Sequence, residues 1–434
     1  MNILKAYTLS LLVLFAALAS CSSQRRINKS AQHNLINSAA LKTAHLGISI
    51  YNLQKDKFLY NHNAEKYFVP ASNTKIPTCY MAMKYLGDSL PGLKVTELDD
   101  KLVVEGAGDP TLLDPEFKYQ PVFDFLKKNR KPIFANVDSL NTEMWGSGWS
   151  WSDFADDYMA ERSALPIYSN VVWFNKKNNG QPEFFPKQKI FVKVEGSGDF
   201  LKNVTRDLRT NSYTAVFDTK GQSEIRVPFI TNSTMSWNLL ADTLGKAIEF
   251  AEPINGEFKN HTIFSQPTDS VLKIMMHRSD NFFAEQMLLM ASNALLNKMT
   301  NQEVIDTILK TDFKNIPQLP VWVDGSGLSR YNLFSPQDFV FILKKMKQDF
   351  GMSRIEAIFP TGGSGTISSY YLNEKGHIFV KTGTLSGVVA LSGFLYTRKK
   401  QLLLFSILVN NHRTSASEVR RSIEKFLKTI RRNY

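Results

Sequence analysis

The chain has 434 residues, of which 43% are hydrophobic and 21% are charged. This length and composition exclude a largely disordered polypeptide and allow two or three domains with full hydrophobic cores. The formal net charge of +12 suits an anionic polymer or membrane surface. Its basic residues are scattered, and no recognised nucleic-acid module accompanies them, so nucleic acid is not an expected partner.

The start of the chain has the pattern of an export signal. Lys5 is basic, residues 9–18 are an apolar run, and Leu18-Ala19-Ser20-Cys21 matches a bacterial lipobox. The apolar run is too short for a lasting transmembrane helix. We therefore predict a lipoprotein signal peptide at residues 1–20, lipidation of Cys21, and a tether over residues 21–41. The alternative is an ordinary secretory signal with an incidental cysteine.

A lipidated Cys21 has two consequences. Ser22 directly after it favours the outer membrane under the usual sorting rule, so we predict an exported, periplasmic protein that is lipid-anchored there. Cys79 would then be the only remaining thiol, and no intramolecular disulfide could form. Since Cys79 lies in an apolar helical pattern, we predict that it is a small core residue.

A candidate nucleophile follows a predicted β-hairpin at residues 47–53 and 57–61. Pro70 and Ala71 precede Ser72, and apolar residues follow, so Ser72 should lie at the N-terminus of a helix. Lys75 is one turn further along and can accept the hydroxyl proton if its own charge is suppressed. Free backbone N–H groups at this helix end suit a developing oxyanion.

The Ser-x-x-Lys pattern alone is weak, because it recurs at Ser270–Lys273 and Ser422–Lys425. Two rarer segments add specificity, namely Ser279-Asp280-Asn281 and Lys381-Thr382-Gly383-Thr384. Ser270 lies only nine residues before Ser279 and is interpreted as a helix N-cap, and no Lys-Thr-Gly follows Ser422. Ser72, Ser279 and Lys381 are therefore the set in the working order. Together the three motifs are the set found in penicillin-binding proteins and serine β-lactamases.

The stretch between the first two motifs is longer than a compact acyltransferase core requires. We predict an inserted accessory domain at residues 94–262, with the catalytic domain formed by residues 42–93 and 263–434. The insert contains short β-type runs separated by Gly, Asn and Pro, which predict a β-rich domain. These runs are residues 101–104, 189–194, 213–217 and 224–230.

The C-terminal part completes an α+β fold. Strands predicted at residues 377–381, 388–396 and 401–410 form an antiparallel sheet with the hairpin. Lys-Thr-Gly then lies on an edge strand, which can pair with an extended peptide. A final helix over residues 415–432 has one apolar face that packs on the sheet, formed by Val419, Ile423, Phe426, Leu427 and Ile430.

The chain resembles the D-alanyl-D-alanine carboxypeptidase/endopeptidase family, the class C low-molecular-mass penicillin-binding proteins. Similar blocks run through nearly the whole mature chain, at residues 70–75, 108–112, 149–151, 279–286, 324–330 and 381–387. One departure is Pro77, where the family usually has an aliphatic residue, and it removes one early helix hydrogen bond. The resemblance implies a penicillin-binding/serine β-lactamase-like core, an antiparallel sheet flanked by helices.

The resemblance also implies residue roles. Ser72 would attack the carbonyl of the penultimate D-alanine with Lys75 as base, and Ser279 would relay a proton to the departing amine. The full catalytic set would be Ser72, Lys75, Ser279 and Lys381. Substrate would be bound by Asn281, Thr382, Gly383 and Thr384, with both threonine hydroxyls on the terminal carboxylate. The backbone N–H groups of Ser72 and Thr384 would form the oxyanion hole.

We therefore expect a serine-type D-alanyl-D-alanine carboxypeptidase, and the same acyl-enzyme could serve a D,D-endopeptidase. The expected partners are peptidoglycan stem peptides, with β-lactam antibiotics as covalent inhibitors. No metal or organic cofactor is expected, because the seven histidines have no ligand spacing. A β-lactamase and a non-catalytic penicillin-binding wall sensor are the alternatives. Residues 324–330 are expected to have a structural role near the site.

Overall fold

A computed structural model of the chain describes residues 25–137, 140–250 and 259–434. The predicted signal peptide and the predicted lipidation site Cys21 lie outside the described residues. Within these ranges, no helix has both the length and the hydropathy that crossing a membrane requires.

A five-stranded antiparallel sheet organises the C-terminal part, with the order β14-β15-β16-β1-β2. Its strands are β1 (His45–Asn52), β2 (Lys57–His62), β14 (Ile378–Leu385), β15 (Val388–Tyr396) and β16 (Leu402–Asn410). The register places Lys381 opposite Ser392 and Ser49 opposite Ser406. The hairpin, the three C-terminal strands and the edge position of β14 confirm the predictions for this sheet.

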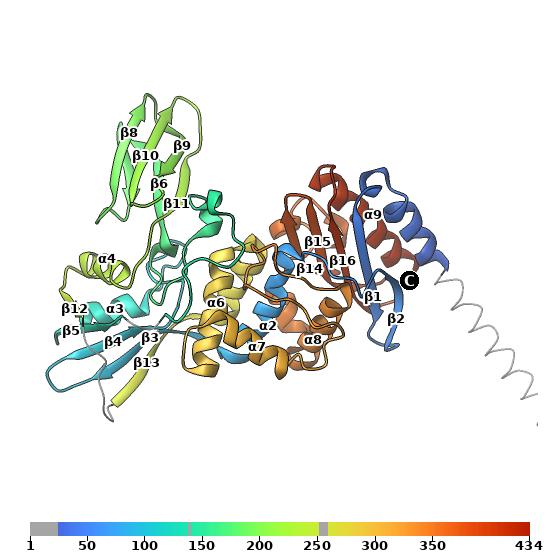
Figure 1. The fold of residues 1–434 in the computed structure, drawn as a ribbon, viewed down its shortest axis with the longest axis horizontal. Helices are drawn as coiled ribbons and strands as arrows, with labels where there is room; N and C mark the ends of the chain where they lie inside the picture. Colours follow the sequence, from blue (N-terminus) through green and yellow to red (C-terminus); the bar gives the residue numbers. More distant parts are fainter. Residues whose placement is uncertain (1–24, 138–139, 251–258) are drawn as a thin grey trace, which may run out of the picture.

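One face of this sheet is covered by α9 (Ala416–Asn433), whose apolar face is buried as predicted. Residues 25–31 are helical and continue into the π-helical η1 (Gln32–Ile36), followed by η2 (Ala39–Leu41). Ile27, Ala31 and Leu35 are buried in the same cluster as α9, and Figure 1 shows the two helical segments side by side. The predicted tether is therefore folded from residue 25 onward, because these apolar side chains leave water.

A group of helices lies on the opposite face, and two of them begin at catalytic motif residues, α2 at Lys75 and α6 at Asn281. The group consists of α2 (Lys75–Tyr85), α5 (Thr268–Ile274), α6 (Asn281–Leu296), α7 (Asn301–Lys310) and α8 (Pro336–Ile358). Ser335 begins α8 with a capping box, in which its hydroxyl accepts from Asp338 N at 3.1 Å and Asp338 accepts from Ser335 N at 2.8 Å. Helix α8 packs directly on β16 and β1.

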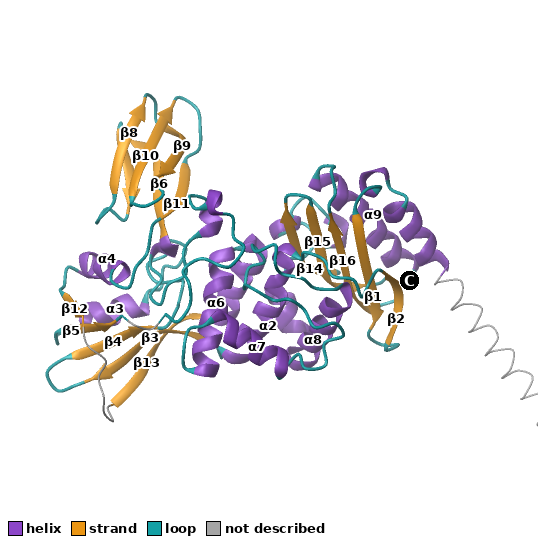
Figure 2. Ribbon diagram, in the orientation of Figure 1, coloured by secondary structure: helices purple, strands orange, loops and turns teal. Residues whose placement is uncertain are grey.

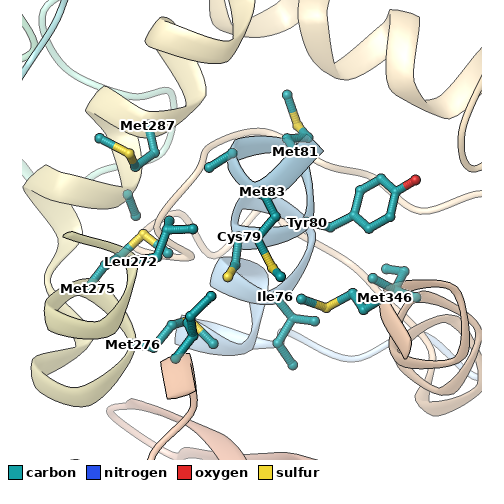
Figure 3. Close-up of a cluster of buried hydrophobic side chains, with 14 of the residues drawn as sticks. Ile76, Cys79, Tyr80, Met81, Met83, Leu272, Met275, Met276, Met287 and Met346 are labelled. Carbon is teal, nitrogen blue, oxygen red and sulfur yellow. The ribbon is translucent and has the colours of Figure 1, made fainter. Parts of the chain in front are cut away.

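Sulfur-containing and aromatic side chains fill the space between α2, α5, α6 and α8 (Figure 3). Met275, Met276 and Met287 are fully buried there beside Cys79. Unbranched methionines fill irregular gaps between crossing helices, which explains their accumulation. Burial raises the pKa of the Cys79 thiol, so Cys79 is an inert core residue, as predicted.

The segment between α2 and α5, which contains the predicted insert, forms a separate strand-rich region on the far side of the helices from the five-stranded sheet (Figures 1 and 2). One sheet has the order β12-β5-β4-β3-β13, a second β11-β6-β7 and a third β8-β10-β9. The strands are β3 (Ser89–Glu97), β4 (Leu102–Gly106), β5 (Ile133–Asn136), β6 (Val171–Asn178), β7 (Gln181–Phe185), β8 (Phe191–Gly196), β9 (Phe200–Arg206), β10 (Ser212–Asp218), β11 (Glu224–Pro228), β12 (Ile248–Phe250) and β13 (Lys259–Pro267).

The structure differs from the predicted insert in two respects. The predicted boundaries, at residues 94 and 262, fall inside β3 and β13, which pair with each other and belong to one sheet with the strands between them. The part also contains two helices, α3 (Pro121–Lys128) and α4 (Met235–Leu244). The strand pairs β4–β5 and β5–β12 are parallel. Parallel neighbouring strands must be joined by crossover connections, which usually contain a helix.

The packing of α9 on the sheet generates a stability prediction. Phe426 is fully buried, so we expect Phe426→Ala to lower the free energy of unfolding by about 3–5 kcal/mol through lost burial and an unfilled cavity. Circular dichroism during urea titration measures this change. Lys425→Ala, at the exposed neighbour, should shift the free energy by less than about 0.5 kcal/mol. Equal effects of the two substitutions would contradict this packing.

Candidate active site

Ser72 lies in the short 3-10 helix η3 (Ala71–Thr74), and α2 begins directly after it at Lys75. The preceding residue, Ala71, has a φ of 47°, a strained conformation for a residue with a Cβ. Pro77 lies in the first turn of α2, where its missing N–H is tolerated. The nucleophile is thus placed on a tight turn before the helix, half-exposed at the surface of the core.

Three acceptors surround the Lys75 ammonium, which is fully buried. Nζ donates to Ser72 Oγ at 2.9 Å, to Asn281 Oδ1 at 2.6 Å and to the Ser326 carbonyl at 2.7 Å. These acceptors come from three separate segments of the chain. Because an ammonium has three N–H donors, its hydrogen-bonding capacity is filled and its position is set.

Burial lowers the pKa of Lys75 to about 8. The dominant cause is loss of hydration, which disfavours the charged form. The carboxylates of Asp280, Asp324 and Glu285 act in the opposite direction and limit the fall. A minor neutral fraction is therefore present at neutral pH and grows as the pH approaches and passes this pKa, which a general base next to Ser72 requires.

Ser279 ends the π-helical turn η7 (Met275–Ser279), and its φ is 63°. Such turns and left-handed residues are concentrated at functional sites. Asp280 caps α6 by accepting from Phe283 N at 2.9 Å. This geometry turns the Ser279 hydroxyl toward β14, where Lys381 Nζ donates to it at 2.8 Å.

Lys381 is the second fully buried lysine of the site. Its Nζ also donates to the Thr382 carbonyl at 2.8 Å. Burial holds the pKa of Lys381 well below its usual range, and the positive charges of Lys75 and Arg420 lower it further. A buried lysine whose pKa is lowered by burial and by neighbouring cations is more typical of a catalytic site than of a stabilising ion-pair network.

Gly383 is required by the close approach of β14 to the nucleophile. A Cβ at this position would lie 2.6 Å from the Pro70 carbonyl and 3.0 Å from Ser72 N, so a side chain would push the strand away. Asn73 joins the same two segments: its side chain contacts Ser392 Oγ at 2.7 Å and, with the amide oriented to satisfy both neighbours, donates to the Lys381 carbonyl at 2.7 Å.

The two threonines of the motif differ in environment. Thr382 is buried and donates to Thr366 Oγ1 at 2.8 Å, whereas Thr384 is exposed on the sheet edge. Asn281 uses both ends of its amide, since Nδ2 donates to the Tyr158 carbonyl at 3.1 Å while Oδ1 accepts from Lys75. Tyr158 lies in the short 3-10 helix η5 (Asp157–Met159), within the insert between β5 and β6, and nothing in its local sequence indicated this contact.

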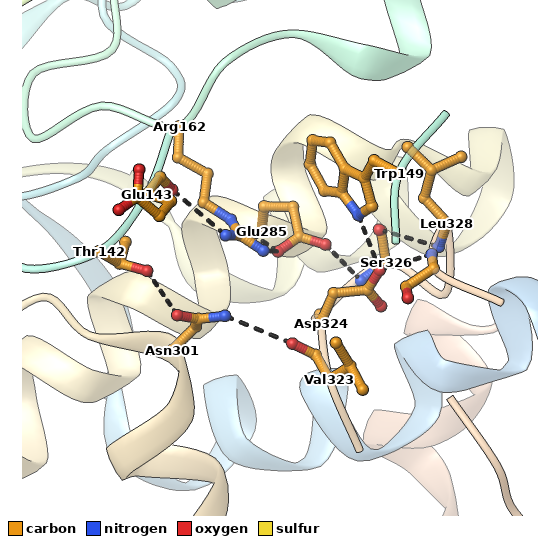
Figure 4. A network of polar contacts seen from close by, with 12 residues as sticks. Thr142, Glu143, Trp149, Arg162, Glu285, Asn301, Val323, Asp324, Ser326 and Leu328 are labelled. Carbon is orange, nitrogen blue, oxygen red and sulfur yellow. Dashed lines mark hydrogen bonds and ion pairs between the residues drawn. The ribbon is translucent and has the colours of Figure 1, made fainter. Parts of the chain in front are cut away.

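Residues 324–329 form a mostly buried turn behind Lys75, and Arg330 after it is exposed; this is compatible with the structural role predicted for residues 324–330. Asp324 accepts from Gly327 N at 2.8 Å and from Ser329 N at 2.7 Å. It also accepts from Trp149 Nε1 at 2.9 Å (Figure 4). Gly327 has a φ of 81°, and a Cβ there would lie 1.9 Å from the Ala71 carbonyl. The turn therefore packs directly against the nucleophile segment.

A buried ion pair connects this turn to the insert. Glu285 of α6 accepts from Arg162 Nε at 3.0 Å and Nη2 at 2.7 Å, and both side chains are 1% exposed. The other oxygen of Glu285 accepts from Ser326 N at 2.8 Å, and the carbonyl of Ser326 contacts Lys75. Figure 4 shows this path from Arg162 to Ser326. Sequence reasoning did not single out Arg162 or Glu285, although Glu285 lies within the motif block of α6.

The structure brings together all eight residues predicted to form the site, namely Ser72, Lys75, Ser279, Asn281, Lys381, Thr382, Gly383 and Thr384. Among the residues that the structure describes, no group of three or more His, Cys, Asp or Glu side chains could hold a metal ion. The arrangement consists of a serine hydroxyl, a buried amine of lowered pKa and a second serine–lysine pair. It can activate Ser72 as a nucleophile toward a carbonyl carbon.

Fold and site together define an active-site serine acyltransferase built on an antiparallel sheet with helices on both faces. The model of the D-Ala-D-Ala carboxypeptidase 3 (S13) family matches residues 28–193 and 260–430, and the chain belongs to this family. It is a serine peptidase of the D-alanyl-D-alanine carboxypeptidase type.

Relatives of known name agree with this assignment. The chain is 23% identical to the D-alanyl-D-alanine carboxypeptidase DacB of Haemophilus influenzae, over 86% of this chain and 87% of that protein. It is 24% identical to penicillin-sensitive carboxypeptidase A of Dictyostelium discoideum, over 83% and 82% of the two chains.

Solved structures confirm the predicted fold class. Penicillin-binding protein 4 of H. influenzae superposes with a TM-score of 0.70 at 20% identity, covering 93% of this chain and 98% of that one. A predatory peptidoglycan endopeptidase of Bdellovibrio bacteriovorus has a TM-score of 0.51 at 12% identity, with coverage of 90% and 93%.

The lowered pKa of Lys75 generates a pH prediction. Below a pH of about 8, Lys75 is increasingly protonated and unable to accept the Ser72 proton. We expect kcat/KM for a D-alanyl-D-alanine peptide to rise with pH and to level off above about that value. Lys75→Met should abolish turnover across the range, whereas Lys84→Met, on the same helix, should keep the profile. A rate independent of pH between 6 and 9, roughly the window about this pKa, would contradict the assignment of Lys75 as base.

Proposed function

We propose that the protein hydrolyses the D-alanyl-D-alanine bond of peptidoglycan stem peptides through an acyl-enzyme on Ser72. The observation that carries this proposal is the 2.9 Å contact between Ser72 Oγ and the buried Nζ of Lys75, whose pKa is lowered to about 8. Neutral Lys75 takes the hydroxyl proton as Ser72 Oγ attacks the carbonyl carbon of the penultimate D-alanine. The resulting tetrahedral oxyanion faces the backbone N–H groups of Ser72 and Thr384.

Collapse of this intermediate breaks the amide bond and leaves an ester on Ser72. The departing amine needs a proton, and Ser279 is suited to deliver it because Lys381 Nζ donates to its hydroxyl at 2.8 Å. Lys381 replaces the proton on Ser279, and the terminal D-alanine leaves. Proton exchange with solvent then returns Lys75 to the neutral amine and Lys381 to the ammonium. Water attacks the ester carbon while neutral Lys75 accepts a proton from that water, and Lys75 passes this proton to Ser72 Oγ as the ester bond breaks, so that Ser72 is regenerated as a hydroxyl.

Substrate orientation follows from β14. The peptide lies along this edge strand beside Gly383, where backbone groups can pair with it. Lys381, Thr382 and Thr384 surround the terminal carboxylate, and Asn281 Nδ2 is available to a substrate amide once it exchanges its contact with the Tyr158 carbonyl. A strand edge with hydroxyls and cations at one end selects extended peptides that end in an anion.

The same acyl-enzyme supports D,D-endopeptidase activity, in which the leaving amine belongs to a neighbouring stem peptide. The likeness to the Bdellovibrio endopeptidase is compatible with this second reaction. β-Lactams are proposed as covalent inhibitors that acylate Ser72, and the similar H. influenzae penicillin-binding protein 4 has been crystallised with a β-lactam. The intact set of motif residues argues against a non-catalytic sensor.

Export and anchoring belong to the proposal as well. The lipobox at residues 18–21 supports cleavage before Cys21 and lipidation of that cysteine, with the enzyme in the periplasm. Ser22 after the cysteine favours attachment to the outer membrane. The enzyme would then act on peptidoglycan from a fixed surface beside its substrate.

Mass spectrometry of reaction products tests the activity. Purified wild type and Ser72→Ala are incubated with a pentapeptide muropeptide and with a cross-linked dimer. We expect wild type to remove one alanine from the pentapeptide or to cleave the dimer, because only wild type can form the acyl-enzyme. Ser72→Ala should turn over neither substrate. Equal turnover by both proteins would exclude Ser72 as the nucleophile.

A fractionation experiment tests the anchor. The native protein, produced in a Gram-negative host and labelled with palmitate, should incorporate label and sediment with membranes. Cys21→Ser should lose the label and appear in the soluble periplasmic fraction, while Cys79→Ser, at the buried thiol, should behave as wild type. Labelling of Cys21→Ser would contradict the predicted lipidation site.

A further inference from the structure

Arg420 reaches the proposed site from a helix that carries none of the three motifs. It lies on α9, and its Nη2 donates to Thr384 Oγ1 at 2.5 Å. Its Nε is buried and has no hydrogen-bond partner among the described residues. The guanidinium at the end of β14 therefore keeps a donor that no described protein group satisfies.

The charge of Arg420 is also uncompensated. Several other arginines of this part of the chain pair with carboxylates, as in Arg421–Glu424 at 2.7 Å and Arg354–Asp269 at 2.8 Å. Among the described residues, neither Arg420 nor Lys381 has a carboxylate within 4.0 Å. Arg420 is also close enough to Lys381 to lower the pKa of that lysine. Two neighbouring cations without an acid favour a bound anion.

The hydroxyl groups between these cations are oriented as donors. Thr384 Oγ1 accepts from Arg420, and Ser279 Oγ accepts from Lys381. A hydroxyl that accepts from a cation is polarised, and its own proton is directed toward a further acceptor. Thr384 is exposed at the sheet edge, so its hydroxyl is available to donate to the end of a peptide that lies on β14. A carboxylate fits this set of donors.

We infer that Arg420 is a positioning residue that determines specificity, holding Thr384 as a donor to the C-terminal carboxylate and adding positive charge there. This inference rests on the proposed function, because it concerns the same substrate. Arg420 acts through Thr384 and through its charge, and takes no part in proton transfer. The enzyme thereby distinguishes peptides that end in a free carboxylate from otherwise identical uncharged ones.

The test compares ligands that differ only in this carboxylate. The rate constant for acylation of Ser72 is measured by mass spectrometry with benzylpenicillin and with its methyl ester. We expect Arg420→Ala to lower the ratio of acid to ester rate constants by roughly 10- to 100-fold, the effect of losing a hydrogen bond and charge at a carboxylate. Arg420→Lys, which keeps the charge, should restore part of the ratio.

Arg421→Ala is the matched control, because Arg421 is the adjacent arginine but donates to Glu424 Oε2 at 2.7 Å and to the Ser369 carbonyl at 3.1 Å. It should leave the ratio unchanged. If Arg420→Ala slows acid and ester equally, the residue is merely structural and the inference is wrong. Failure of wild type to be acylated by either ligand would instead overturn the proposed function, and this inference with it.

A double-mutant cycle separates action through Thr384 from a general effect of charge. If Arg420 works by orienting the Thr384 hydroxyl, Arg420→Ala should reduce the ratio far less in a Thr384→Val background than in wild type. Independent, multiplying effects would contradict the orienting role. Melting temperatures of all variants, measured by circular dichroism, verify that each is folded under the assay conditions.

Discussion

The removal of the Lys75 ammonium from water is the constraint on which this structure depends. A buried cation is unfavourable unless acceptors replace its hydration, and here Ser72, Asn281 and the Ser326 carbonyl do so. Each acceptor lies on a different segment, so the 3-10 turn, helix α6 and the turn at residues 324–330 must meet at one point. The methionine-rich core and the Arg162–Glu285 ion pair hold these segments in place.

This dependence makes the insert part of the catalytic apparatus. Arg162 lies within the insert, between β5 and β6, and Glu285 is buried with it. Removing one member of such a pair leaves an uncompensated buried charge, which is strongly destabilising. Glu285 also accepts a hydrogen bond from Ser326 N, and the Ser326 carbonyl accepts from Lys75. A substitution of Arg162 therefore affects Lys75 through two consecutive hydrogen bonds, Arg162–Glu285 and Glu285–Ser326. The insert therefore helps to position Lys75, the proposed general base, in addition to enlarging the protein surface.

The fold class and the motif residues could be predicted from the sequence, because they depend on local periodicity and on rare residue combinations. The left-handed conformation of Ser279 and the contact between Arg420 and Thr384 could not be predicted, since both depend on tertiary packing. Arg420 and Arg421 are equivalent in the sequence, yet among the described residues Arg421 has a carboxylate partner and Arg420 has none. Helix α3 was missed although Pro121 at its first turn is a start signal.

The short free edge of β14 has a consequence for solubility. An open strand edge can pair with strands of other chains and so promote aggregation. An enzyme that binds extended peptides along a strand nevertheless needs such an open edge. Here Val380 N already donates to the Pro360 carbonyl at 3.0 Å, and Thr361 bridges to Phe379. In the part of the chain that the structure describes, residues 381–385 have no strand neighbour on this side, and the nucleophile segment lies against Gly383. The opening admits a peptide end but is too short and too crowded for another protein's strand to extend the sheet.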